Sequence, residues 1–68
     1  MVNTQYLEEA IANSGKKKQF LAEKCGLSRF GFYQRINNQA EFTAGQIKVL
    51  CSELGITSLK RKEDIFFA

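Results

Sequence analysis

Proline and histidine are absent from this chain, and only two cysteines occur among its 68 residues. β-Branched residues are few, and no stretch alternates polar and apolar residues for long enough to indicate a sheet. This pattern predicts an all-α fold. Without histidine or a C-x-x-C pair, the chain lacks the ligand sets typical of zinc sites, so we expect neither a metal nor a cofactor.

Other absences exclude further classes of protein. No apolar run reaches the ~20 residues that span a bilayer, and the first 15 residues lack the basic start and apolar core of a signal peptide. We therefore expect no membrane partner and a cytoplasmic location, where Cys25 and Cys51 stay reduced as buried, structural thiols. Paired carboxylates in an apolar setting and a glycine-rich phosphate loop are also missing, so we expect that the chain is not an enzyme.

What the chain does contain is enough for one small domain over residues 1–68, with six phenylalanines and two tyrosines for its core. Helices are expected over about residues 4–13 and 18–25, then from Ser28 to Asn37 and Asn38, from Thr43 to Gly55, and from Ser58 onward. Thr43-Ala44-Gly45-Gln46 has the form of a capping box. The clearest helical spacing follows it, at Ile47, Leu50, Cys51 and Leu54. Leu59, Ile65 and Phe66 are the apolar residues of the last helix.

The most informative segment is KQFLAEKCGLSRFGFYQRINN, from Lys18 to Asn38. Gly26 can end its first helix in the left-handed conformation, and Ser28 can cap the next one. The segment therefore predicts a helix, a short turn and a second helix. In the second helix Phe32 and Ile36 are expected to face the core. The residues expected to face outward are Arg29, Phe30, Tyr33 and Gln34.

Positive charge is concentrated around this segment. Residues 16–38 carry six basic residues against Glu23 alone, a balance of +5: Lys16, Lys17, Lys18, Lys24, Arg29 and Arg35. Clustered cations beside such a helix pair favour a polyanionic partner. The alternative is a solvated basic surface without a partner.

The string L-A-E-K-C-G-L-S, followed eight residues later by I-N, resembles the Cro/repressor helix-turn-helix family of phage and bacterial regulators. The F-Y-Q-R-I-N, E-F-T and I-F-F segments resemble a subgroup of short regulators from temperate phages of Gram-positive bacteria. This resemblance implies a compact five-helix lambda-repressor-like domain in the cytoplasm of a bacterial host. It also implies double-stranded operator DNA as partner.

The resemblance assigns roles to individual positions. The first residues of the recognition helix, which read base edges, are Ser28, Arg29 and Phe30 here, and Gln34 lies one turn further on. Arginine can pair with guanine and glutamine with adenine, at ~1–3 kcal/mol of discrimination each. The expected phosphate contacts are Lys16, Lys17, Lys18, Arg35, Asn37 and Asn38.

Two functions remain open from the sequence. The first is a sequence-specific, Cro-type transcriptional regulator in a phage lysis/lysogeny switch. The alternative is a phage antirepressor, which binds the repressor's DNA-binding domain through its own helix-turn-helix face, because Phe30 and Tyr33 beside Arg29 also resemble a protein–protein hot spot. Phe30 could instead fold back onto the core. The tail Ile65-Phe66-Phe67 is either a homodimer surface or part of the core.

Overall fold

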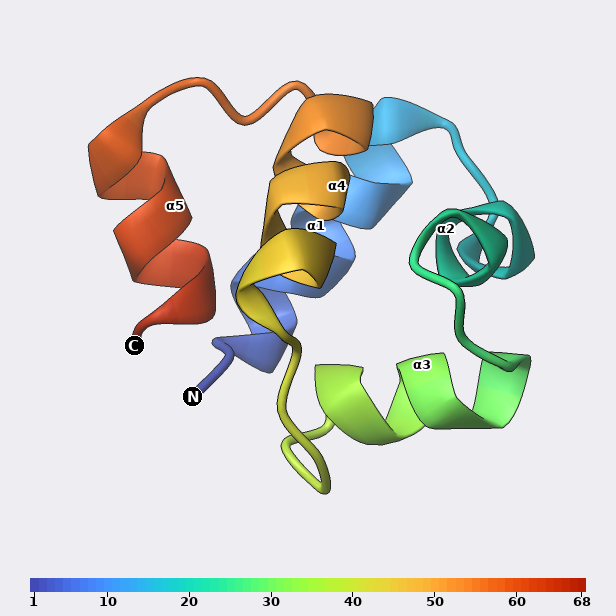
Figure 1. Cartoon of the computed structure of the whole chain (residues 1–68). Helices are drawn as coiled ribbons and strands as arrows, with labels where there is room; N and C mark the ends of the chain where they lie inside the picture. The colour runs from blue at the N-terminus through green and yellow to red at the C-terminus, as the bar shows by residue number, and fades with distance from the viewer.

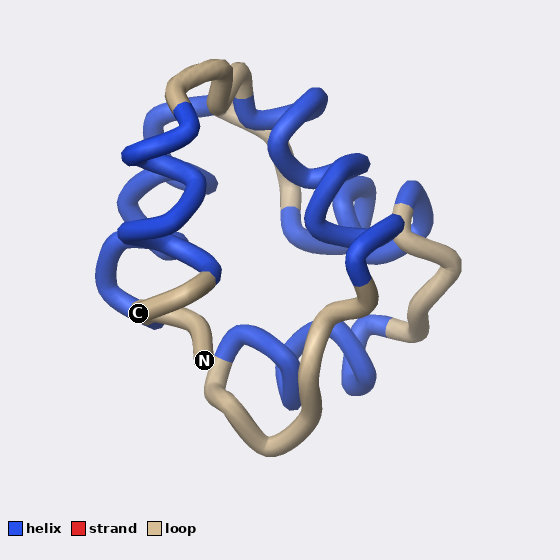
Figure 2. Tube along the Cα trace, turned by 60° about the vertical axis from the view of Figure 1, so that its left-hand side comes forward, coloured by secondary structure: helices blue, strands red, loops and turns tan.

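The computed structural model describes residues 1–68 as five helices without strands (Figures 1 and 2). The helices are α1 (Thr4–Ser14), α2 (Lys18–Lys24), α3 (Arg29–Ile36), α4 (Ala44–Leu54) and α5 (Leu59–Phe66). The prediction of an all-α chain is confirmed. The second helix ends one residue earlier than expected, because Cys25 already belongs to the turn. None of the five helices is both long and apolar enough to cross a membrane.

A side-chain cap marks the start of every helix except α2. The Asn3 side chain accepts a hydrogen bond from the Tyr6 N–H at 3.1 Å and caps α1. The predicted capping box of α4 is present: Thr43 Oγ1 accepts from the Gln46 N–H at 3.1 Å, and Gln46 Oε1 accepts from the Thr43 N–H at 2.9 Å. Because these bonds join residues close in sequence, the sequence pattern predicts them well.

The core consists of 15 buried apolar residues, and no polar or charged residue is buried. α4 packs against α1 and α2, and the predicted inward residues Ile47, Leu50 and Leu54 are all buried. Phe42, just before α4, contacts the Phe32 ring edge-on at 5.8 Å between centroids. On its other side Phe42 meets Phe66 at 6.1 Å, so one aromatic chain connects α3 with α5.

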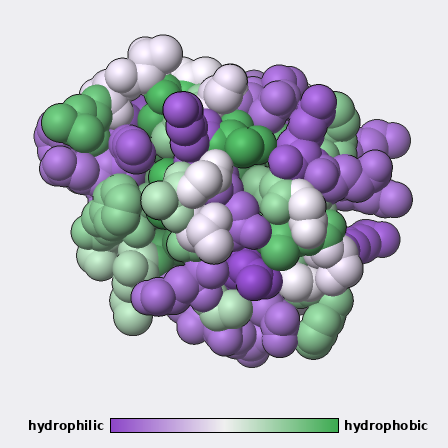
Figure 3. Space-filling view, viewed as in Figure 1, coloured by the Kyte–Doolittle hydropathy of each residue, from purple (hydrophilic) through white to green (hydrophobic).

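The predictions for the last helix are only partly right. Ile65 and Phe66 are buried and complete the core, whereas Leu59 is 69% exposed and Phe67 is 59% exposed. Leu59 occupies the first turn of α5, which lies at the edge of the molecule in Figure 1. In Figure 3 apolar surface is more extensive on the side of α5, whereas hydrophilic side chains predominate on the side of α2.

The segment before α1 is hydrogen-bonded both to the last helix and to the loop after α3. The Asn3 N–H donates to the Ile65 carbonyl at 2.7 Å, and the Asn38 side chain makes two 2.8 Å hydrogen bonds with the backbone of Val2. Thr4 Oγ1 adds a 2.7 Å bond to the carbonyl of Ile36 at the end of α3. Asn38 has φ 62°, a left-handed conformation that asparagine tolerates better than most residues and that ends α3. The C-terminal end of α3 is therefore held firmly against the start of α1.

Candidate functional site

α2 and α3 are joined by a turn whose backbone hydrogen bonds leave little freedom. The Leu27 N–H donates to the Ala22 carbonyl at 2.9 Å, and the Gly26 N–H donates to the Glu23 carbonyl at 3.0 Å, with Gly26 at φ 71°. This pair of bonds is a Schellman motif. Figure 1 shows α2 nearly along its axis while α3 runs across the view, so the two helices cross at a steep angle. The helix, the short turn and the second helix that the sequence predicts for this segment are present.

Ser28 begins α3, and its hydroxyl oxygen accepts a hydrogen bond from the Gly31 N–H at 3.0 Å. The outward face then carries Arg29, Phe30 and Tyr33, with Phe30 69% and Tyr33 56% exposed. The alternative in which Phe30 folds back onto the core is wrong. Gln34, which was expected to face outward with them, is half-buried instead. Phe32 and Ile36 are buried as expected.

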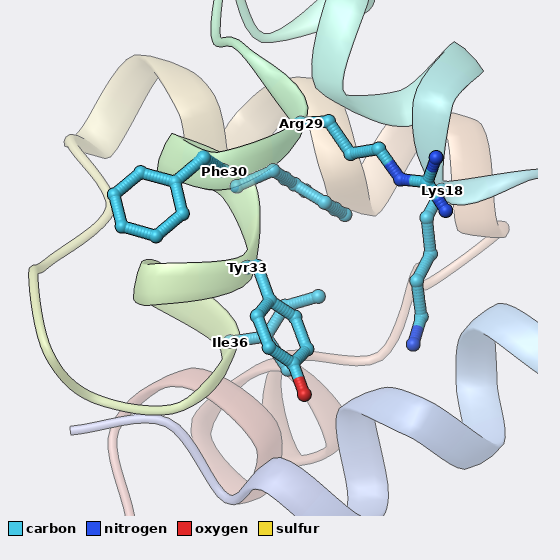
Figure 4. Close-up of a pocket in the computed structure, with 6 residues that line it drawn as sticks. Lys18, Arg29, Phe30, Tyr33 and Ile36 are labelled. Atoms are coloured by element: carbon cyan, nitrogen blue, oxygen red, sulfur yellow. The ribbon is translucent and has the colours of Figure 1, made fainter.

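An open hollow of about 520 Å³ lies on this face. It is lined by Lys18 of α2 and by Arg29, Phe30, Phe32, Tyr33 and Ile36 of α3 (Figure 4). Figure 4 shows Lys18 and Arg29 on one side and the Phe30 ring on the other. Aromatic and aliphatic walls beside two cations suit a ligand group that combines apolar surface with negative charge.

Two of the lysines expected at phosphates are already bound within the protein. Lys18 Nζ lies 2.9 Å from the Glu8 carboxylate, and Lys16 Nζ lies 2.8 Å from that of Glu53. The hydrogen bond from Lys16 holds the pKa of Glu53 below its usual value. Lys16 also donates to the Glu53 carbonyl at 2.8 Å, near the end of α4. Lys17 is exposed and makes no ion pair.

The other expected phosphate contacts also make hydrogen bonds within the protein. Arg35 Nη1 donates to the Gly31 carbonyl at 2.8 Å, and the Asn37 side chain donates to the Tyr33 carbonyl at 3.0 Å. The Asn37 and Asn38 N–H groups donate to the carbonyls of Tyr33 and Arg35, at 3.2 and 3.3 Å. The role of these residues at phosphate stays a prediction, because the side chains of Arg35 and the two asparagines keep further N–H donors.

Sequence reasoning missed Phe20, which is 41% exposed on α2. The ammonium groups of Lys16 and Lys24 lie 5.9 and 5.5 Å from the centroid of its ring, within the range of cation–π contacts. The signal that was overlooked is spacing, because the two lysines lie four residues before and four residues after the phenylalanine. Phe20 and these two lysines, one on α2 and one just before it, therefore form a surface that is both apolar and positively charged.

The two thiols lie at the edge of the core. Cys25 and Cys51 are both free, as expected, and each packs against the core, but their burial is only partial. Burial raises the pKa of both thiols, which keeps them protonated near neutral pH. No group of three or more histidine, cysteine, aspartate or glutamate side chains lies close enough together to hold a metal ion.

Comparison of the chain with protein-family models, with curated proteins and with solved structures finds no match.

Proposed function

We propose that this chain is a lambda-repressor-like helix-turn-helix domain that binds operator DNA as a Cro-type regulator in a phage lysis/lysogeny switch. The observation that carries the proposal is the exposure of the first residues of α3, Arg29 and Phe30, beside the short turn from α2. A second helix that crosses the first steeply and presents its first residues to solvent is the geometry with which such motifs enter the major groove.

The proposed base contacts come from the first turns of α3. Arg29 is exposed, and it lies close enough to the start of the helix to reach a guanine edge. The Ser28 oxygen is occupied as a cap, so its hydroxyl hydrogen is the group left for DNA. Gln34 would need a rotamer that extends its amide out of its half-buried position. Lys17 is the exposed cation that we assign first to phosphate, because no carboxylate holds it.

The test is selection of binding sites from a pool of randomised DNA duplexes, followed by titration of the selected sequence. Arg29→Ala should relax the preference at one base pair, whereas Lys17→Ala should weaken all sequences alike and flatten the salt dependence by about one unit. Lys48→Ala, an exposed change on α4, serves as the control. Failure of the wild-type protein to bind any duplex at low salt would reject the proposal.

The alternative function, an antirepressor that binds the repressor's DNA-binding domain, is favoured by the hollow on α3. Phe30 and Tyr33 stand at its rim with most of their rings exposed, which is costly for a surface that no partner covers. The ion pairs of Lys16 and Lys18 also reduce the positive charge that DNA would meet. A partner helix with an apolar residue and a carboxylate would fit this surface.

Titration with the DNA-binding domain of the cognate repressor separates the two functions. If the alternative holds, Phe30→Ala should cost ~2 kcal/mol or more of partner affinity, as expected for a buried aromatic anchor. Salt should affect this complex less than a DNA complex, because burial of aromatic surface is not screened. Leu59→Ala, an equally exposed apolar change on α5, is the matched control.

A homodimer is compatible with either function. Cro-type regulators bind half-sites about one helical turn apart as dimers. Of the tail expected at a dimer surface, Phe67 alone is exposed, so Phe67→Ala should weaken self-association if the tail forms that contact. Sedimentation of the wild-type and variant proteins at several concentrations measures this.

A further inference from the structure

We infer that Glu8 is an internal competitor of DNA phosphate for Lys18, and that this competition limits how many phosphates the protein engages. The inference rests on the proposed DNA-binding function. α1 carries none of the predicted site residues. Through Glu8 it nevertheless controls Lys18, a cation at the edge of the surface that α2 and α3 form.

The contact between the two side chains involves both carboxylate oxygens. Lys18 Nζ lies 2.9 Å from Glu8 Oε1 and 3.0 Å from Oε2. Lys18 is the first residue of α2 and also lines the hollow beside Arg29. Figure 4 shows its side chain running from α2 toward α1, the helix that carries Glu8. The ammonium is therefore directed toward the neighbouring helix α1.

The pair is accessible to a competing anion. The Lys18 and Glu8 side chains are 42% and 38% exposed, and ion pairs in such positions are weakly held. A phosphate that displaces the Glu8 carboxylate from Lys18 must also overcome repulsion from that carboxylate, which remains nearby. If Glu8 competes with phosphate for the Lys18 ammonium, the number of phosphate contacts falls. If Glu8 only repels DNA through its charge, the affinity falls but the number of phosphate contacts stays the same.

The neighbouring lysines differ from Lys18 in this respect. Lys16 is held by the Glu53 carboxylate and also by the carbonyl of the same residue, so it would stay in place without the carboxylate. Lys17 makes no ion pair and is available throughout. Lys18 is therefore the one lysine in this run whose availability depends on a single carboxylate.

The experiment measures the affinity for a short mixed-sequence DNA duplex at several salt concentrations, because non-specific binding counts phosphate contacts without knowledge of the operator. The proteins are wild type, Glu8→Gln, Lys18→Met and the matched control Glu9→Gln. Glu9 is exposed on the same helix and hydrogen bonds only Gln5, so its loss removes equal charge and leaves Lys18 bound. Thermal melts of all four proteins check the fold.

Glu8→Gln should gain one phosphate contact and steepen the slope of log K against log salt by about 0.9. A fourfold dilution of salt should then strengthen its binding about 3.5 times more than that of wild type. Glu9→Gln should bind more tightly with an unchanged slope. Lys18→Met should keep the wild-type slope, because its ammonium is already withdrawn from DNA.

Two results would overturn the inference while the proposed function stands: equal slopes for Glu8→Gln and Glu9→Gln, or a slope flattened by about one unit in Lys18→Met, since Lys18 would then contact phosphate in the wild-type protein. Absence of DNA binding by every protein at low salt would instead reject the proposed function, and the inference with it.

Discussion

Gly31 and Arg35 fit together along the surface of α3: Arg35 Nη1 donates to the Gly31 carbonyl at 2.8 Å, and a Cβ on Gly31 would lie 3.3 Å from that same nitrogen. The Ser28 hydroxyl, which caps the helix, would lie equally close to this Cβ. A glycine inside a helix costs ~1 kcal/mol relative to alanine. Here its small size leaves room for a guanidinium that folds back along its own helix.

This contact predicts a coupling between the two positions. Gly31→Ala should change the free energy of unfolding little in the wild-type background, because the gain in helix propensity is offset by the displaced hydrogen bond. In an Arg35→Ala background it should stabilise by up to ~1 kcal/mol. Urea unfolding of the four proteins measures the difference. An equal change in the free energy of unfolding in both backgrounds would show that Arg35 does not affect which residue is tolerated at position 31.

Leu50→Ala should cost ~2–5 kcal/mol, enough to unfold much of so small a protein. Leu50 is completely buried on α4, and its truncation leaves a cavity between helices that cannot close fully. The melting temperature should fall by many degrees, whereas Lys48→Ala, two residues away and exposed, should leave it almost unchanged. A melting temperature near that of wild type would mean that the core can repack around alanine.

The sequence predicted those parts of the structure that depend on near neighbours. The Thr43–Gln46 capping box and the spacing of Ile47, Leu50 and Leu54 each lie within one helix, so residue type and interval suffice. The apolar residues of the last helix do not reveal from the sequence that Leu59 is exposed while Ile65 and Phe66 are buried, because periodicity indicates one face of a helix but not whether another helix covers each of its turns.

The site was harder to predict than the fold. The exposed residues Arg29, Phe30 and Tyr33 follow from helical spacing, which the structure confirms. The ion pair that Lys18 makes with Glu8 joins two helices, and no pattern along the chain specifies which charged side chains meet across such a gap. The basic segment therefore carries less free positive charge than its composition suggests.

Asn38 should prove hard to replace even by glycine, the residue best suited to its positive φ. Asn38→Gly removes two side-chain hydrogen bonds to Val2, each contributing ~0.5–1.5 kcal/mol, although it relieves the backbone. Asn38→Ala should cost roughly 1 kcal/mol more, since alanine disfavours this conformation. Denaturant titration gives both values. Greater stability of the glycine variant than of wild type would show that the bonds to Val2 contribute nothing.

The Lys16–Glu53 contact predicts a small dependence of stability on pH. Because the pKa of Glu53 is lowered in the folded protein, its ion pair stabilises the fold above the ordinary glutamate pKa, and this contribution is lost as the pH falls through the lowered value. The difference in melting temperature between wild type and Glu53→Gln should therefore shrink on acidification. Glu63→Gln, which removes a charge that makes no ion pair, should show no such convergence.

Both thiols should react slowly with a thiol reagent in the native protein and quickly in denaturant. Partial burial raises the pKa of Cys25 and Cys51, which lowers the fraction of reactive thiolate. A raised pKa in the folded state also means that the associated stability is complete below the ordinary thiol pKa and declines as the pH rises through the raised value. Rapid labelling of both residues at neutral pH under native conditions would contradict this prediction.

The hydrogen bond from Asn3 to Ile65 also joins two segments that are far apart in the sequence, which bears on the order in which contacts form during folding. The contacts among α2, α3 and α4 span shorter distances along the chain, and closing a short loop costs less entropy than closing a long one. The stretch from α2 to α4 can therefore assemble first. The bonds from Val2 and Thr4 to the end of α3 close loops of intermediate length, whereas the bond between the segment before α1 and α5 closes a longer one. We therefore expect the contact between Asn3 and α5 to form after the others.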